Sequence, residues 1–219
     1  MEEELTLEQL IGKIKDRDDK VRAAAWQSAG KVGAAAVKPL ADLMTEMDAE
    51  VARLTKSSGT ARDEIAYNLE VGRAAKHALW AIVRYVGRPG ADDEKRPVVG
   101  ALCRLLGGGR VPSGWAAVLR EVLWMLSEVG GDEAVNAIRN IPGILEDQQI
   151  REDARCAVER IPGQAATQAL LDGLEGASDD FRLAIAQSLR VRGAEVDKEK
   201  YPSQKLVPTR QTKVQPVGR

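Results

Sequence analysis

The stretch that decides the fold is residues 19–33, Asp-Lys-Val-Arg-Ala-Ala-Ala-Trp-Gln-Ser-Ala-Gly-Lys-Val-Gly. Its aliphatic residues recur every three or four positions, which is the spacing of one face of a helix. These positions are Val21, Ala25, Ala29 and Val32. Asp18 and Asp19 can cap the start of such a helix, and Gly33 can end it. The stretch therefore predicts an amphipathic helix that buries small aliphatic side chains.

The same spacing recurs along the chain when segments are aligned on the residue that closes each helix. The closing residues are Gly33, Gly87, Gly130, Pro162 and Gly193, which are 54, 43, 32 and 31 residues apart. Apolar residues lie twelve, eight, four and one positions before each of the first four. In the fifth segment the last position is Arg192, which we expect to face water at the end of a repeat array. Self-similarity of this period indicates stacked helix hairpins.

A second helical pattern precedes each of these segments, so the chain predicts an all-α solenoid of about five antiparallel helix pairs. The preceding helices are expected at Leu7–Ile14 behind a Thr6/Gln9 capping box, and at Pro39–Leu54, Val98–Leu106, Glu133–Asn140 and Gln164–Leu174. The helix expected at Pro39–Leu54 is the third along the chain and is longer than its counterparts. Its length accounts for part of the 54-residue separation between Gly33 and Gly87. The helix that closes at Gly87 is expected to bury Ile65 and Leu69.

Three segments resemble HEAT repeats of the phycobilisome-lyase-like type, namely Asp19–Trp26 with Gly30–Gly33, Ile150–Ile161 and Asp180–Arg190. In that family an Asp caps the second helix, a Val-Arg pair follows, and small residues let neighbouring repeats stack. The resemblance covers about residues 5–193. It implies an α-solenoid but no single activity, because scaffolds, lyases and other enzymes share this repeat.

The composition of the 219-residue chain excludes several classes of function. One histidine cannot support a multi-histidine metal site, and 32 Lys+Arg against 33 Asp+Glu argue against binding driven by bulk charge. The longest stretch without a charged residue is Ile161–Leu171, too short for the ~18–20 residues that span a bilayer. Cys103 and Cys156 lie far apart in the sequence, and we interpret each as a small side chain of the core rather than a metal or redox ligand. With an acidic start in place of a secretory signal, we expect a cytoplasmic protein without cofactor.

Tryptophans recur in similar repeat positions, each four residues after a cation. The rings are Trp26, Trp80 and Trp124, and the cations are Arg22, Lys76 and Arg120. Positions i and i+4 meet on a helix, so each couple predicts a cation–π contact. Two interpretations remain open. The rings fill gaps between stacked repeats, or they join Tyr67 and Trp115 as aromatic anchors beside a partner groove.

The helix before Gly87 carries Arg73, His77, Trp80 and Arg84 on one face. Such a face either binds an anionic or aromatic group or is simply solvated around one partly buried ring. His77 has no Ser or Cys nucleophile near it in sequence, so we assign it no catalytic role. The acidic couples Asp92-Asp93 and Asp179-Asp180 precede expected helices and read as caps.

The end of the chain differs in charge from the rest. Residues 201–219 carry four cations and no acid, which leaves a charge of −5 on the preceding 200 residues. We therefore divide the chain into a repeat domain, residues 1–197, and an extended basic tail, residues 198–219. The tail is either a solvated end or an extended peptide that folds onto an acidic partner or a nucleic acid. Its candidate contacts are Lys205, Arg210 and Lys213.

The sequence thus favours a non-catalytic scaffold or adaptor that binds a protein partner in a concave groove, with the tail as a second contact. Two alternatives remain open. One is a bilin lyase or isomerase, as the repeat type allows. The other, less favoured, is a nucleic-acid-binding HEAT-like protein that uses Arg22, Arg73, Arg84, Arg120, Arg151 and Arg155.

Overall fold

A computed structural model describes residues 5–56, 61–107 and 115–203 of the chain. Within these ranges the chain is all-helical, as predicted, with ten α-helices, one 3₁₀ helix (η1) and no strand. The helices are α1 (Leu7–Ile14), α2 (Asp19–Gln27), η1 (Ala29–Ala36), α3 (Val37–Lys56), α4 (Arg62–Val86), α5 (Asp92–Leu106), α6 (Ala116–Val129), α7 (Asp132–Arg139), α8 (Arg151–Arg160), α9 (Gln164–Gly176) and α10 (Asp179–Val191). None of them is long and apolar enough to cross a membrane.

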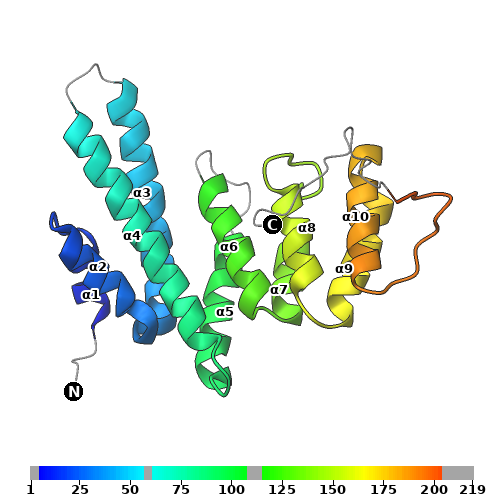
Figure 1. Ribbon diagram of the computed structural model, residues 1–219, viewed down its shortest axis with the longest axis horizontal. Helices are drawn as coiled ribbons and strands as arrows, with labels where there is room; N and C mark the ends of the chain where they lie inside the picture. Colours follow the sequence, from blue (N-terminus) through cyan, green and yellow to red (C-terminus); the bar gives the residue numbers. More distant parts are fainter. Residues whose placement is uncertain (1–4, 57–60, 108–114, 204–219) are drawn as a thin grey trace, which may run out of the picture.

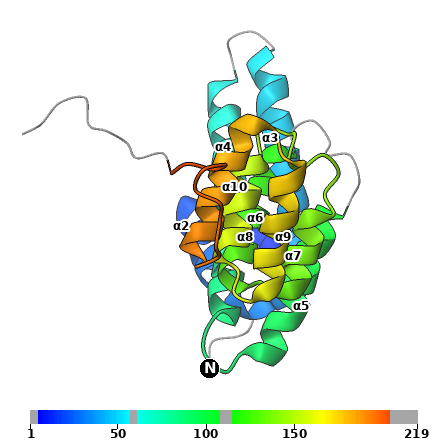
Figure 2. The same cartoon turned by 90° about the vertical axis from the view of Figure 1, so that its right-hand side faces the viewer.

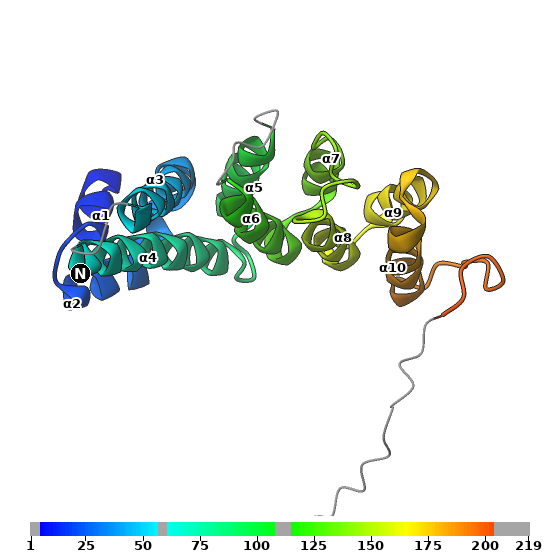
Figure 3. The ribbon, with the colours of Figure 1, turned by 90° about the horizontal axis from the view of Figure 1, so that it is seen from above.

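The helices follow one another in a row along the longest axis of the molecule (Figure 1). Seen from above, they form two layers (Figure 3). Helices α3, α5, α7 and α9 contact one another in order in the first layer, and α2, α4, α6, α8 and α10 do so in the second. We call the latter the second-helix layer. Viewed end on, α9 and α10 stand in front of the rest of the row (Figure 2).

The apolar positions that define the sequence repeat form the core between the layers. The buried ones are Ala25, Ala29, Ala75, Leu79, Val83, Val86, Val118, Val122, Leu126, Val129, Ile150, Ala154, Val158, Ile161, Phe181, Ile185 and Leu189. Only Val21 and Val32, in the first segment, are partly exposed. At these aligned positions, local hydrophobic spacing therefore identified the buried face correctly outside the first segment.

The first segment departs from the single helix that its spacing predicts. The Asp18 carboxylate caps α2 as expected, accepting a hydrogen bond of 2.8 Å from the Lys20 amide. The α-helix then gives way to η1 before Gly33, whose φ of +70° lies in the left-handed region that favours glycine. Gly30 lies so close to α4 that a Cβ on it would come within 2.8 Å of the Tyr85 Cβ. Close packing against α4 thus accompanies the tighter turn.

Helices α3 and α4 form a long antiparallel hairpin that extends beyond its neighbours at the top of Figure 1. They span 20 and 25 residues, so the expected insertion in the third helix is confirmed. The prediction that Leu69 is buried was wrong, since it is 46% exposed. The buried stripe of α4 runs instead through Asn68 and Val71. Successive side chains on a helix are about 100° apart, so Leu69, one position after Asn68, lies off this stripe.

Two helices begin earlier than predicted, which changes the role of the acidic couples. Helix α5 begins at Asp92 rather than near Val98, and α10 begins at Asp179. Both couples therefore lie in the first helical turn and not before it. There the carboxylates complement the partial positive charge of the helix N-terminus.

The expectation that Arg192 faces water was also wrong. Its guanidinium donates hydrogen bonds to the carbonyls of Glu159 and Ile161, both at 2.7 Å, and of Gly163, at 2.6 Å. Its Nε donates to Thr167 Oγ1 at 3.0 Å. The last carbonyls of a helix have no partner within the helix, and a cation is favourable there. Arg192 therefore caps the C-terminus of α8 and ties α10 to the turn before α9.

Candidate functional site

The three recurring tryptophans lie on successive helices of the second-helix layer, each half-buried. Trp80 is on α4, and its Nε1 donates a hydrogen bond of 2.9 Å to Oε2 of Glu121 on α6. The other oxygen of that carboxylate lies 3.4 Å from Lys76 Nζ. One acid on the next helix thus pairs with both the ring and the cation of the preceding helix.

The same arrangement recurs one helix further along the row. Trp124 Nε1 on α6 donates to Asp153 Oδ1 on α8 at 2.9 Å, and Arg120 Nε lies 3.1 Å from Asp153 Oδ2. We call each set an indole–carboxylate bridge. Both bridges join neighbours in the layer, so these rings do fill gaps between stacked helices. Both Trp80 and Trp124 remain partly exposed.

Glu121 and Asp153 are the residues that sequence reasoning missed. Each lies nine positions before its closing residue, Gly130 or Pro162. The signal was therefore present in the aligned repeats. This signal is weak, because an acidic residue on a helix surface is ordinarily interpreted as a solvated side chain.

The three predicted i,i+4 cation–π contacts do not occur among the described residues. Arg84 lies over the Trp80 ring instead, with Cζ 5.6 Å from the centroid. The physical reason is that side chains on a helix point back toward its N-terminus. A cation four residues after a ring therefore reaches over it, whereas Lys76, four residues before Trp80, reaches away. Arg22 is buried and donates instead to the Asp16 carbonyl at 2.7 Å.

The boundary between α2 and α4 is aromatic. The Trp26 ring meets the His77 ring edge-on, with centroids 5.0 Å apart and planes at 76°. Burial lowers the pKa of His77 from its ordinary value, and the charges of Lys76, Arg73 and Arg84 lower it further. The imidazole is therefore neutral at pH 7. The predicted face of α4 gathers His77, Trp80 and Arg84, while Arg73 pairs with Glu70 at 2.5 Å.

Tyr67 and Trp115 make contacts of other kinds. Tyr67 donates a hydrogen bond of 2.7 Å to the Lys15 carbonyl, and Arg17 Cζ lies 4.2 Å from its ring centroid. It therefore ties α4 to the turn between α1 and α2. Trp115 immediately precedes α6 and packs partly buried against the core.

Only the first part of the predicted tail is described. There the carbonyl of Tyr201 accepts a hydrogen bond from Arg190 Nη2, which holds the chain against α10. Lys205, Arg210 and Lys213 lie outside the described residues. The proposed role of these cations therefore stays a prediction.

A pocket that sequence reasoning did not find lies among α7, α8, α9 and α10. Its volume is about 190 Å³. Apolar side chains from all four helices and from the segment between α7 and α8 line it, including Ile138, Leu145, Val158, Leu170, Phe181 and Ile185. Arg139 and Arg151 contribute guanidinium groups to the lining. No sequence signal marks this pocket, because its walls come from four helices and meet only in the folded chain.

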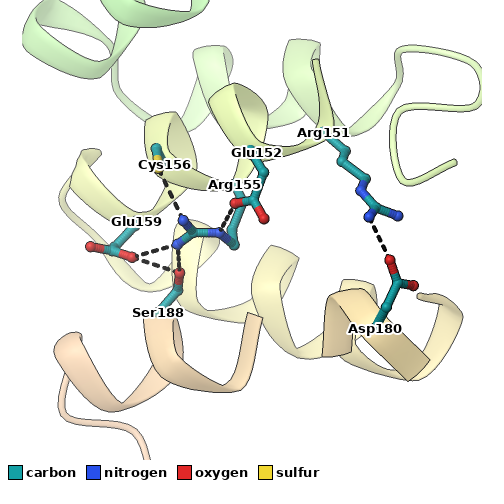
Figure 4. Close-up of polar contacts among 7 residues, drawn as sticks. All are labelled: Arg151, Glu152, Arg155, Cys156, Glu159, Asp180 and Ser188. Atoms are coloured by element: carbon teal, nitrogen blue, oxygen red, sulfur yellow. Dashed lines mark hydrogen bonds and ion pairs between the residues drawn. The ribbon is translucent and has the colours of Figure 1, made fainter. Parts of the chain in front are cut away.

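Arg155 also lines this pocket and anchors α8 to α10 (Figure 4). Its Nη1 donates to Glu159 Oε2 at 2.9 Å and to Ser188 Oγ at 2.5 Å, and its Nη2 donates to Cys156 Sγ at 3.1 Å. Ser188 in turn donates to Glu159 Oε2 at 2.6 Å. Ser188 is fully buried, and burial raises the pKa of the partly exposed Cys156 thiol, which favours the thiol over the nucleophilic thiolate.

The described residues contain no group of three or more His, Cys, Asp or Glu side chains arranged to hold a metal ion. No family model, curated protein or solved structure matches this chain. Two features of the described residues could contact a partner: the bridged tryptophans of the second-helix layer and the pocket of α7–α10.

Proposed function

We propose that this protein is a HEAT-like α-solenoid that acts as a non-catalytic scaffold and binds a protein partner along its second-helix layer. The observation that carries the proposal is the pair of indole–carboxylate bridges. They hold two partly exposed rings, together with Lys76 and Arg120, in defined positions along adjacent helices. Binding costs less when contact side chains are already ordered, and Trp and Arg are enriched among residues that dominate protein interfaces.

Charge pairing supports a protein partner over a nucleic acid. A phosphate-binding groove requires cations that can neutralise phosphates. Three of the arginines considered for that role are held in partly buried contacts. Arg22 donates to the Asp16 carbonyl, Arg120 pairs with Asp153, and Arg155 pairs with Glu159.

A site-specific photo-crosslinker tests which face binds the partner. It is placed at Arg84, exposed on α4 of the second-helix layer, and, as a matched control, at Lys38, exposed on α3 of the first layer. In the native cell, we expect one discrete protein adduct from position 84 and none from position 38. Equal labelling from both faces, or no protein adduct from either, would contradict the proposal.

The same experiment in a chain ending at Lys200 tests the tail as a second contact. We expect a weaker adduct from position 84 in this shortened chain. An adduct of unchanged yield would show that the tail takes no part in binding. Adducts with nucleic acid in place of protein would refute the choice of partner class.

A further inference from the structure

The pocket among α7–α10 is small and apolar inside. Phe181 and Ile185 of α10 are 1% exposed, and Leu170 of α9 is 4% exposed. Binding pockets for drug-sized molecules measure about 300–1,000 Å³. At about 190 Å³, this pocket is too small for such a ligand but has room for one large apolar side chain. Interfaces commonly place one anchor side chain of the partner in a pocket of this kind.

The lining of the pocket is positively charged. It includes three guanidinium groups, those of Arg139, Arg151 and Arg155, against one carboxylate, that of Asp172. The Arg151 guanidinium lies over the Phe181 ring, with Cζ 4.7 Å from the centroid. It therefore joins the apolar interior to the charged mouth. A ligand that is apolar at its tip and acidic beside it complements both parts.

The carboxylates that now pair with two of these arginines can be exchanged for those of a partner. Arg139 pairs with Asp172 at 2.6 Å, and their side chains are 44% and 43% exposed. Arg151 pairs with Asp180 at 2.6 Å; its own side chain is 15% exposed and that of Asp180 is 60% exposed (Figure 4). The Arg139–Asp172 pair is exposed on both sides, and such pairs contribute little to stability, so replacing Asp172 costs little. A bound peptide would exclude water from the mouth and strengthen the new arginine–carboxylate bonds.

We propose that this pocket binds an acidic peptide segment of a protein partner, with one large apolar side chain inserted among α8, α9 and α10 and flanking carboxylates on Arg139 and Arg151. The inference rests on the proposed scaffold function and names the chemistry of the partner. The pocket would be a second docking point, in addition to the rings of α2, α4 and α6.

Gly173 offers a way to close the pocket without disturbing the fold. A Cβ at this position would lie 3.8 Å from Ile185 Cδ1 and 3.9 Å from Leu145 Cδ2, which are ordinary contacts. Leu is a better helix former than Gly, so Gly173→Leu fills the cavity while favouring α9. The matched control is Gly12→Leu on α1, where nothing lies within 4 Å of the added Cβ.

The probes are fluorescein-labelled synthetic nonapeptides with a central Phe between two Glu on each side. Anisotropy titrations with the full chain measure their affinity. We expect at least tenfold weaker binding to Gly173→Leu and to Arg139→Gln, and unchanged binding to Gly12→Leu. Peptides with Lys in place of Glu, or Ala in place of Phe, should also bind at least tenfold more weakly. Thermal unfolding of each variant checks that it is folded.

Three outcomes would overturn the inference: no binding of the Phe–Glu peptide, equal binding of the Lys-flanked peptide, or unchanged affinity in Gly173→Leu. Decanoate is included as a competitor, and saturable decanoate binding without peptide binding would assign the pocket to a small amphipathic anion instead. The crosslink at position 84 separates the two proposals. If Gly173→Leu keeps that adduct while the peptide fails to bind, the pocket proposal fails and the scaffold proposal stands.

Discussion

Replacement of Arg192 by Met tests whether a side-chain cap holds the end of α10 against α8 and the turn before α9. Methionine keeps an unbranched side chain but removes the guanidinium that donates to the carbonyls of Glu159, Ile161 and Gly163. These carbonyls belong to the end of α8 and to the turn that follows. The substitution therefore leaves several acceptors without a donor at the junction of α8, α9 and α10.

The structure sets the size of the effect. A hydrogen bond that involves a charged group contributes about 1.5–3 kcal/mol to stability. The three bonds share one guanidinium, and part of that group reaches solvent, so their contributions do not add. We expect Arg192→Met to lower the free energy of unfolding by about 2–4 kcal/mol. For a chain of this size, each kcal/mol lowers the melting temperature by roughly 2–4 °C.

Urea unfolding followed by circular dichroism measures this free energy. The matched control is Arg53→Met on α3, which removes an exposed ion pair with Glu50 at 2.5 Å. Exposed pairs contribute about 0–1 kcal/mol. Arg192→Lys should recover part of the loss, since an ammonium reaches fewer carbonyls than the guanidinium does. If Arg192→Met were no more destabilising than Arg53→Met, the capping role would be refuted.

The remaining predictions concern the tryptophan bridges, the histidine and one thiol. A double-mutant cycle of Trp80→Phe and Glu121→Gln should give a coupling energy of about 1–2 kcal/mol in urea unfolding, and additive effects would show that the bridge is not formed. The pKa of His77 is lowered in the folded chain, so the unfolded chain binds this proton first as pH falls below the ordinary value of 6.5. Stability should therefore decline from pH 7 toward pH 5, and less steeply in His77→Gln; identical slopes would contradict this. Burial raises the pKa of Cys103 from 9.0 to about 11, so iodoacetamide at pH 8 should meet about a hundredfold less thiolate than at an ordinary thiol. Alkylation in the native protein as fast as in urea would refute the burial argument.

Helix content and the buried positions were largely readable from the chain. The aliphatic residues twelve, eight, four and one positions before Gly87, Gly130 and Pro162 are all buried. The Thr6/Gln9 capping box also forms as predicted. These features depend on contacts within one or two helical turns, which the order of residues specifies directly. Leu69 shows the limit of that reasoning. Its spacing fits a core face, but the neighbouring helices cover a different stripe of α4.

The candidate site was predicted only in part. The recurrence of Trp26, Trp80 and Trp124 indicated a shared role, but only Trp80 and Trp124 bond to an acid on the next helix of the layer. These acids, Glu121 and Asp153, lie at a common position in the aligned segments. The partner of each indole was not predictable, because Trp80 bonds to an acid 41 residues away in sequence and Trp124 to one 29 residues away. Which residues meet at such separations depends on how the ridges of one helix seat in the grooves of the next.

By itself, then, the sequence determined that the described chain is helical and which positions of most helices are buried. Tertiary structure alone decided that Arg192 caps α8, that the tryptophans bond across helices, and that α7–α10 enclose a charged, apolar pocket. The physical reason is one of range. Helical periodicity is a property of residues three and four apart, whereas caps, bridges and pockets are made by side chains brought together only when the helices pack.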